Sequence, residues 1–132
     1  MKRKSRILIG KVGLDGHDVG ARVVAKALSN AGMEVVYTGL RQTPEQIVRA
    51  AIEESVDIIG ISILSGSHMT LLPEIIRSLN RHKANDIHFI VGGIIPAEDI
   101  PVLKKMGVKE LFPPETITSD IVDYVKDLIT IH

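Results

Sequence analysis

The residues of this chain with the clearest chemical potential lie in the segment KVGLDGHDVGARVV, residues 11–24. Within it, His17 stands between Asp15 and Asp18, and glycines surround all three. An aspartate two residues before a histidine can accept the Nδ1 proton of the imidazole and leave Nε2 free to bind a metal. A plainer interpretation is a polar loop in which Asp18 caps the following helix and the glycines turn the chain.

Known phosphate-binding and dinucleotide-binding loops do not match this segment. A dinucleotide fingerprint needs the spacing Gly-x-Gly-x-x-Gly, but the glycines of residues 10–16 are three positions apart. A Walker loop ends in Gly-Lys followed by Ser or Thr, whereas Gly16 is followed by His17. Residues 10–20 contain no serine or threonine to wrap a phosphate, and residues 61–64 lack the aspartate of a phosphoacceptor domain.

A single histidine does not make a site for a bare metal ion, because such sites need three or four protein ligands. The other histidines of the chain do not stand at ligand spacing from His17; they are His68, His82, His88 and His132. An isolated ligand makes sense where the metal arrives in a macrocycle with one axial position to fill, as in haem or a corrinoid. The segment alone leaves both this interpretation and the polar-loop interpretation open.

The overall composition fits one globular domain. The chain has 132 residues, of which 45% are hydrophobic, and we expect residues 1–132 to form a single domain with residues 1–5 as a flexible basic leader. Sixteen basic and sixteen acidic residues cancel, which argues against nucleic-acid and membrane-surface partners. Cysteine is absent and no apolar run approaches the roughly 20 residues of a membrane helix, so we expect a cytoplasmic protein.

Apolar runs of strand length alternate along the chain with segments of helical periodicity, which predicts a parallel sheet with crossover helices. We expect strands at residues 7–12, 34–38, 56–64, 88–91 and 110–112, and helices at residues 20–31, 44–55, 69–81, 96–106 and 119–131. Gly32 should end the first helix, Thr43 should cap the second, and Pro73 should lie near the first turn of the third. This pattern favours a flavodoxin-like (Rossmann-type) doubly wound α/β fold, with a five-stranded parallel sheet in the order 2-1-3-4-5.

This strand order also predicts where a ligand would bind. The loops after the first and third strands meet at the crevice where sheets of this kind bind ligands. His17 follows the first strand, Ser62 and Leu64 end the third, and Gly92-Gly93 closes the fourth. Taken singly, a strand serine that bonds only backbone and a glycine turn are ordinary features. Together they predict a narrow slot beside the sheet that suits a flat heterocycle.

The motif set Asp15-x-His17-x-x-Gly20, Ser62-x-Leu64 and Gly92-Gly93 resembles the cobalamin-binding domain of vitamin B12 enzymes that hold the cofactor base-off and His-on. The similarity extends over nearly the whole chain from Arg6 onward. The segments KVGLDGHDVGARVVAKAL, YTGLRQTPEQIVRAA, ISILSGSHMTL and GGIIPAEDIPVLKKMGV resemble the small C-terminal domain of the methylmalonyl-CoA mutase family. In that family the domain also occurs as a separate small subunit.

The resemblance implies a role for each matching residue. His17 would be the lower axial ligand of cobalt, Asp15 would accept a hydrogen bond from the far ring nitrogen, and Lys11 would complete this relay. The displaced nucleotide tail would enter the slot, with Ser62 bonding its base and Leu64 packing on it. The other residues that the resemblance places at the cofactor are Gly16, Asp18, Gly20, Gly66, Gly92, Gly93, Phe112 and Thr116. In the family that the chain resembles, a tyrosine is common at the position of Phe112. The hydrogen bond of its phenol group is therefore absent here.

The function implied by the resemblance is that of the cofactor-binding subunit of an isomerase. With adenosylcobalamin it would support the radical interconversion of methylmalonyl-CoA and succinyl-CoA. The acyl-CoA would be held by a large, barrel-type mutase subunit, so no catalytic residue is expected in this chain and no activity without that partner. The first alternative is the small subunit of 2-hydroxyisobutyryl-CoA mutase or a related acyl-CoA mutase. More remote alternatives are a corrinoid methyl carrier and a cobalamin-sensing module.

Overall fold

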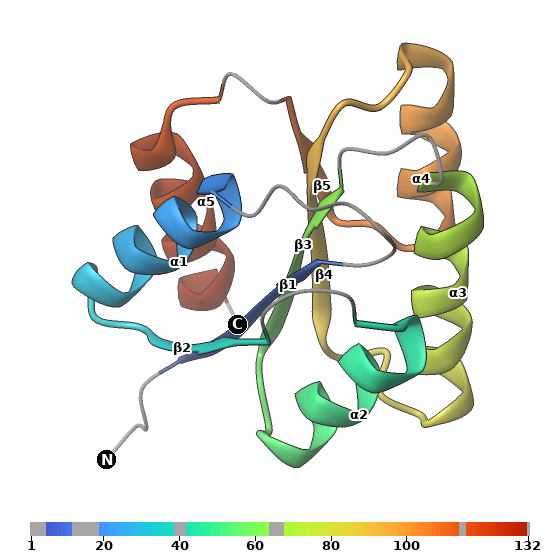
Figure 1. Ribbon diagram of the computed structural model, residues 1–132, viewed down its shortest axis with the longest axis horizontal. Helices are drawn as coiled ribbons and strands as arrows, with labels where there is room; N and C mark the ends of the chain where they lie inside the picture. Colours follow the sequence, from blue (N-terminus) through green and yellow to red (C-terminus); the bar gives the residue numbers. More distant parts are fainter. Residues whose placement is uncertain (1–4, 12–18, 39–41, 64–67, 114–115, 132) are drawn as a thin grey trace.

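The computed structural model describes residues 5–11, 19–38, 42–63, 68–113 and 116–131 (Figure 1). These residues form a parallel five-stranded sheet in the order β2-β1-β3-β4-β5, which confirms the predicted fold class and strand order. The strands are β1 (Arg6–Lys11), β2 (Glu34–Tyr37), β3 (Ile58–Ile63), β4 (His88–Gly93) and β5 (Glu110–Phe112). The helices are α1 (Val19–Asn30), α2 (Pro44–Glu53), α3 (His68–Arg81), the 3-10 turn η1 (Ala97–Asp99), α4 (Ile100–Met106) and α5 (Thr118–Ile131). No helix within the described ranges is long and apolar enough to cross a bilayer.

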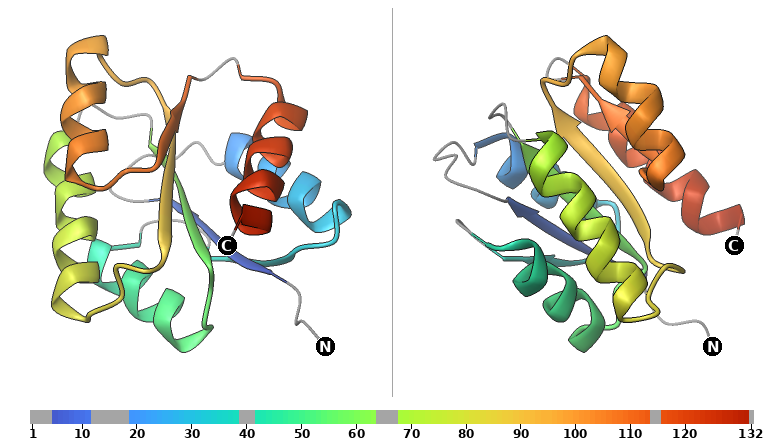
Figure 2. Two further views of the ribbon diagram at one scale, coloured as in Figure 1. Left: turned by 180° about the vertical axis from the view of Figure 1, so that it is seen from behind. Right: turned by 90° about the vertical axis from the view of Figure 1, so that its right-hand side faces the viewer.

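Helices cover both faces of the sheet. Figure 1 shows α1 and α5 on one face and α2, α3 and α4 on the other, and the rear view in Figure 2 shows the same division. Alternate residues of β1 divide between the two cores: Leu8 belongs to the core under α2 and α3, while Ile7 and Ile9 belong to the core under α1 and α5. Because both faces are buried, the strands are continuously apolar in sequence, as is typical of parallel sheets.

The ends of the helices follow from local sequence. Before α2, the Thr43 hydroxyl accepts a hydrogen bond from the Gln46 amide (3.1 Å), and the Gln46 side chain accepts one from the Thr43 amide (2.9 Å). This reciprocal capping box confirms the predicted start of the helix. Gly32 has a φ of 97° after α1, a conformation that favours glycine, and so it ends that helix as expected. The helix α3 begins at His68, one residue earlier than predicted, and Pro73 is its sixth residue, inside the helix just beyond the first turn.

Other boundaries also differ from the sequence-based expectation, most of them by one or two residues, and two of the differences have a clear local cause. The predicted helix 96–106 divides into η1 and α4, because Pro101 is tolerated in the first turn of a helix but not in its interior. The third strand begins at Ile58 rather than at residue 56. The reason is that the Val56 amide donates to the Ala51 carbonyl (3.1 Å) and still belongs to the end of α2.

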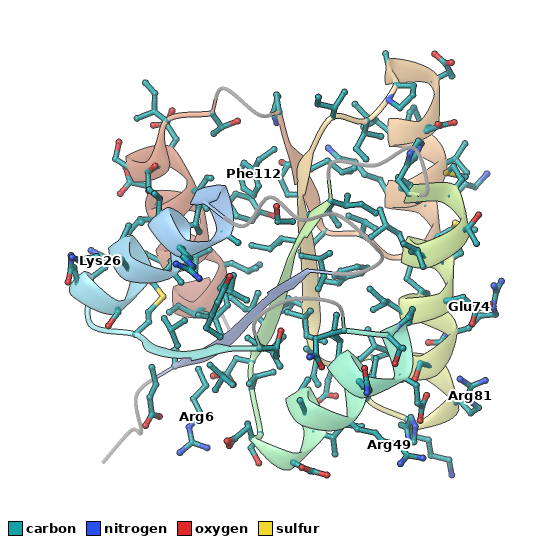
Figure 3. The ribbon with its side chains drawn as sticks, viewed as in Figure 1. Arg6, Lys26, Arg49, Glu74, Arg81 and Phe112 are labelled. Carbon is teal, nitrogen blue, oxygen red and sulfur yellow. The ribbon has the colours of Figure 1, made fainter. Side chains whose placement is uncertain are left out.

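A cluster of hydrogen bonds around Glu45 joins α2 to α3. One carboxylate oxygen accepts from the buried Ser78 hydroxyl (2.6 Å), and the other interacts with Arg49 (3.0 Å) and His82 (2.9 Å). Figure 3 shows Arg49 and Arg81, from the two helices, on the same side of the molecule. The bond from Ser78, followed by those from His82 and Arg49, lowers the pKa of Glu45 from 4.5 to about 2. The ionised carboxylate therefore stabilises the contact between the two helices.

We predict that Glu45→Gln lowers the free energy of unfolding near neutral pH and flattens its acid dependence. The folded-state pKa of Glu45 lies below its ordinary value, so the stabilisation is complete above about pH 4.5 and is lost as the pH falls towards 2. Urea unfolding at several pH values in this window measures the effect. Glu53→Gln, which changes an exposed carboxylate at the other end of α2, is the matched control. Equal pH profiles for the two variants would contradict the assignment.

Candidate functional site

Four of the residues that the sequence predicts at the site lie on one row across the sheet. Lys11 pairs with Ser62, Ser62 with Gly92, and Gly92 with Phe112, so the row crosses β1, β3, β4 and β5. The row stands at the carboxyl ends of the strands, where doubly wound sheets bind ligands. Residues 92 and 112 lie almost a whole domain away from residue 11 in the sequence, and only the sheet brings them together.

A cavity of about 480 Å³ opens between this row and the helices α1 and α5. Its floor is the row two residues earlier along the strands, whose side chains share the same face of the sheet, and in this row Ile9 pairs with Gly60 and Gly60 with Ile90. Its walls come from α1, from the start of α5, and from the segment between β5 and α5; they include Ala21, Val23, Val24, Pro113, Thr116, Thr118 and Ile121. The volume falls within the roughly 300–1,000 Å³ typical of small-molecule sites.

The cavity exists because glycines stand where side chains would otherwise fill it. A Cβ atom at position 60 would lie 2.9 Å from Cδ1 of Ile9, and a Cβ at position 92 would have no neighbour closer than 4.0 Å, the Phe112 carbonyl oxygen. Gly60 was not predicted as a site residue. A glycine inside a continuously apolar strand often marks the close approach of a ligand, and that signal was present in the sequence.

The lining is mostly apolar, with a few polar groups. The Ser62 hydroxyl, at the end of β3, is only partly buried and belongs to the lining. The Thr116 hydroxyl also lies at the cavity but donates to the Pro113 carbonyl (2.7 Å), so it is bound to the residue that follows β5. Apolar walls with a small number of placed polar groups suit a flat aromatic ligand with a hydrogen-bonding edge.

The aromatic ring of Phe112 is held in place by a second aromatic ring, that of Tyr124. Figure 3 shows Phe112 on the side of the sheet that faces α1 and α5. Its ring meets that of Tyr124 edge to face, with centroids 5.4 Å apart and planes at 79°. Burial, and secondarily the carboxylate of Glu110, raises the pKa of Tyr124, so the phenol stays neutral at ordinary pH. Phe112 therefore presents a fixed apolar face to the cavity.

The structure brings together part of the predicted site. Ser62, Gly92, Gly93, Phe112 and Thr116 all line the cavity. Lys11 is the last residue of β1 and Gly20 the second residue of α1, so they bound the segment that contains the histidine. The remaining predicted residues, Asp15, Gly16, His17, Asp18, Leu64 and Gly66, lie outside the described residues, and their roles stay predictions.

Comparison with known proteins decides the family. Residues 5–122 match the model of the B12 binding domain. The chain belongs to the B12-binding domain family. This domain is 46% identical over 124 residues to the 2-hydroxyisobutanoyl-CoA mutase small subunit of Aquincola tertiaricarbonis, a match that covers 94% of this chain and 91% of that protein. It is 42% identical over 130 residues to the methylmalonyl-CoA mutase of Escherichia coli K12, covering 98% of this chain but only 18% of that protein.

The B12-binding domain also has similar solved structures. The crystal structure of a novel cobalamin-binding protein from Desulfitobacterium hafniense DCB-2 superimposes with a TM-score of 0.81 at 23% identity, over 95% of this chain and 59% of that one. At this level of identity the similarity shows the fold alone. The family match and the mutase relatives together confirm the resemblance that the sequence motifs indicate.

Two neighbouring glycines of the B12-binding domain should differ sharply in their tolerance of a side chain. Gly93 has a φ of 150°, and a Cβ there would lie 1.8 Å from the Ile63 carbonyl oxygen, whereas the space at Gly92 is open. We predict that Gly93→Ala lowers the free energy of unfolding by at least about 2 kcal/mol. Gly92→Ala should change it by less than about 1 kcal/mol. Urea unfolding of both variants tests this, and similar losses would contradict the geometry.

Proposed function

We propose that this chain is the cobalamin-binding small subunit, or the corresponding domain, of an adenosylcobalamin-dependent acyl-CoA mutase. The observation that supports it most directly is the cavity at the carboxyl edge of the sheet, with glycines in its floor, between β1 and α1, the two elements that flank His17 in the sequence. Membership of the B12-binding domain family and the mutase relatives support the same function.

The cavity fits the nucleotide tail of cobalamin in chemistry and in size. The tail ends in a flat aromatic base, which suits apolar walls such as Ile9, Ile90 and Phe112. The Ser62 hydroxyl stands at the cavity as a hydrogen-bonding group for a ring nitrogen. Gly60 and Gly92 have no side chains, and this leaves room for the aromatic base. Larger residues at these positions would occupy the space that the base needs.

The binding mode we propose is base-off and His-on. With the nucleotide base removed to the cavity, Nε2 of His17 would hold the lower face of the cobalt, while Asp15 would fix the imidazole tautomer through Nδ1 and Lys11 would moderate the carboxylate. When bound, the cofactor supplies the radical chemistry of the isomerisation. The chain itself contributes binding and orientation, so we assign it no catalytic residue.

The substrate and the partner belong to this proposal as well. We infer a large, barrel-type subunit that holds the acyl-CoA over the upper face of the cofactor. Sequence motifs favoured methylmalonyl-CoA as the substrate, and that preference is not confirmed. The small subunit of 2-hydroxyisobutanoyl-CoA mutase has nearly the same extent as this chain, whereas the chain spans less than a fifth of the E. coli methylmalonyl-CoA mutase. The higher identity to the first of these two proteins, 46% against 42%, makes 2-hydroxyisobutyryl-CoA the second candidate substrate.

We predict that His17→Ala abolishes the His-on absorption spectrum of added adenosylcobalamin, and that Asp15→Asn weakens binding about 10- to 100-fold. Protons compete with cobalt for imidazole, so the affinity should also fall below a pH of roughly 6.5. Absorption titration measures both effects. His82→Ala, which removes a histidine at the far end of α3, is the matched control. Unchanged spectra in His17→Ala would contradict the ligand assignment.

We also predict that acyl-CoA isomerisation requires a large mutase subunit in addition to this chain. The measurement is a coupled assay with methylmalonyl-CoA and 2-hydroxyisobutyryl-CoA, using a large subunit of each class with this chain or its His17→Ala variant. Turnover should appear with one partner only and should fall by about 100-fold or more in the variant. Activity of this chain with no large subunit would contradict the proposal that the large subunit holds the substrate. Equal activity of the His17→Ala variant and the wild type would contradict the proposal that this chain holds the cofactor through His17.

A further inference from the structure

A second histidine, His68, lies outside the segment that contains His17 and contacts an aspartate, Asp99. His68 is the first residue of α3 and is 7% exposed. Its Nε2 lies 2.8 Å from Oδ2 of Asp99, which belongs to η1, a turn that follows a different strand. The partners are 31 positions apart in the sequence. This contact joins the first residue of α3 to the last residue of η1.

The position of Asp99 makes this contact informative. Asp99 is the N-cap residue of α4, where an aspartate normally accepts a hydrogen bond from an amide of its own helix. Its side chain makes no such capping bond, and the carboxylate reaches His68 instead. A local stabilising interaction is thus absent, and a long-range one takes its place.

The burial of His68 is costly as well. Its Nδ1 is buried and has no hydrogen-bond partner among the residues that the structure describes. An unpaired polar atom in an apolar interior costs free energy that leucine or phenylalanine would avoid. A residue selected only for packing in this core would be apolar, so the imidazole must contribute through its bond to Asp99.

The contact also lies close to the cavity residues along the chain. Ile63 pairs with Gly93 as the last step of the β3–β4 ladder, and His68 and Asp99 follow these two residues by five and six positions. The side-chain bond therefore links α3, which follows β3, to η1, which follows β4. Ser62 and Gly92, one position before the last step of the ladder, line the cavity.

We infer that His68 and Asp99 are positioning residues that hold the ends of β3 and β4 at the spacing that the nucleotide slot needs. This inference rests on the proposed function, because the slot is the site of the cobalamin tail. Neither residue touches the cavity, so both act through the backbone at Ser62, Gly92 and Gly93. A carboxylate oxygen accepts, so Nε2–H of His68 is the donor in this bond to Asp99.

The test compares affinity for cobalamin with affinity for cobinamide, the corrinoid that lacks the nucleotide tail. Asp99→Ala removes the acceptor, and His68→Phe keeps a ring of similar volume but removes the donor. Each should weaken cobalamin about tenfold and leave cobinamide within about twofold, and the double variant should be no weaker than either single one. Asp99→Asn retains an oxygen acceptor and should stay within about threefold of the wild type.

The matched control is His82→Phe, which breaks a similar histidine–carboxylate contact, His82 to Glu45 (2.9 Å), just beyond the other end of α3. It should leave the ratio of the two affinities unchanged. Thermal unfolding of every variant shows whether it is folded, and His68→Phe keeps the test informative if Asp99→Ala does not fold. Equal losses for cobalamin and cobinamide, or wild-type affinity in both variants, would overturn the inference alone. A wild-type chain that binds no cobalamin would overturn the proposed function and this inference with it.

Discussion

The hydrogen-bonded register at the carboxyl edge of the parallel sheet is the constraint on which the site depends. It aligns Lys11, Ser62, Gly92 and Phe112 in one row and places Gly60 in the row two residues earlier, on the same face of the sheet. Side chains alternate between the faces of a strand, so a shift of one residue would turn Ser62 away from the cavity and turn a buried isoleucine into it. Register is strongly specified wherever a face of the sheet is buried against a core, as it is here.

The two faces of the sheet differ in role: one is a filled core that stabilises the fold, and the other contains the cavity. The face under α2, α3 and α4 is filled by side chains such as Leu72, Ile75 and Leu103, which are fully buried, and the Glu45 cluster ties its helices together. The face under α1 and α5 leaves a cavity beside its core. Unfilled apolar space lowers stability unless a ligand occupies it. A ligand that fills this space would therefore stabilise the folded chain.

The sequence predicted the fold well because its signals are local and repeated. Alternating apolar runs and helical periodicity give the class and strand order, and Gly32 and Thr43 mark helix ends. Ser62 and Gly92 were also found, since they end strands that meet at one edge. The contribution of α1 and α5 to the walls was not predicted, because periodicity identifies the buried side of a helix but not what it faces. The bond between His68 and Asp99 was missed for a similar reason, since it joins residues far apart in the chain.

Nuclear magnetic resonance spectra of the isoleucine methyl groups, recorded during titration with cobalamin and with cobinamide, test directly whether the nucleotide tail enters the cavity. The methyl groups of Ile9, Ile90 and Ile121 line the cavity, and those of Ile59 and Ile75 lie in the opposite core. An aromatic base in the cavity should shift the first three resonances strongly with cobalamin, weakly with cobinamide, and leave the other two nearly unchanged. Shifts confined to the opposite core, or equal shifts with both corrinoids, would contradict the claim that the cavity receives the nucleotide tail.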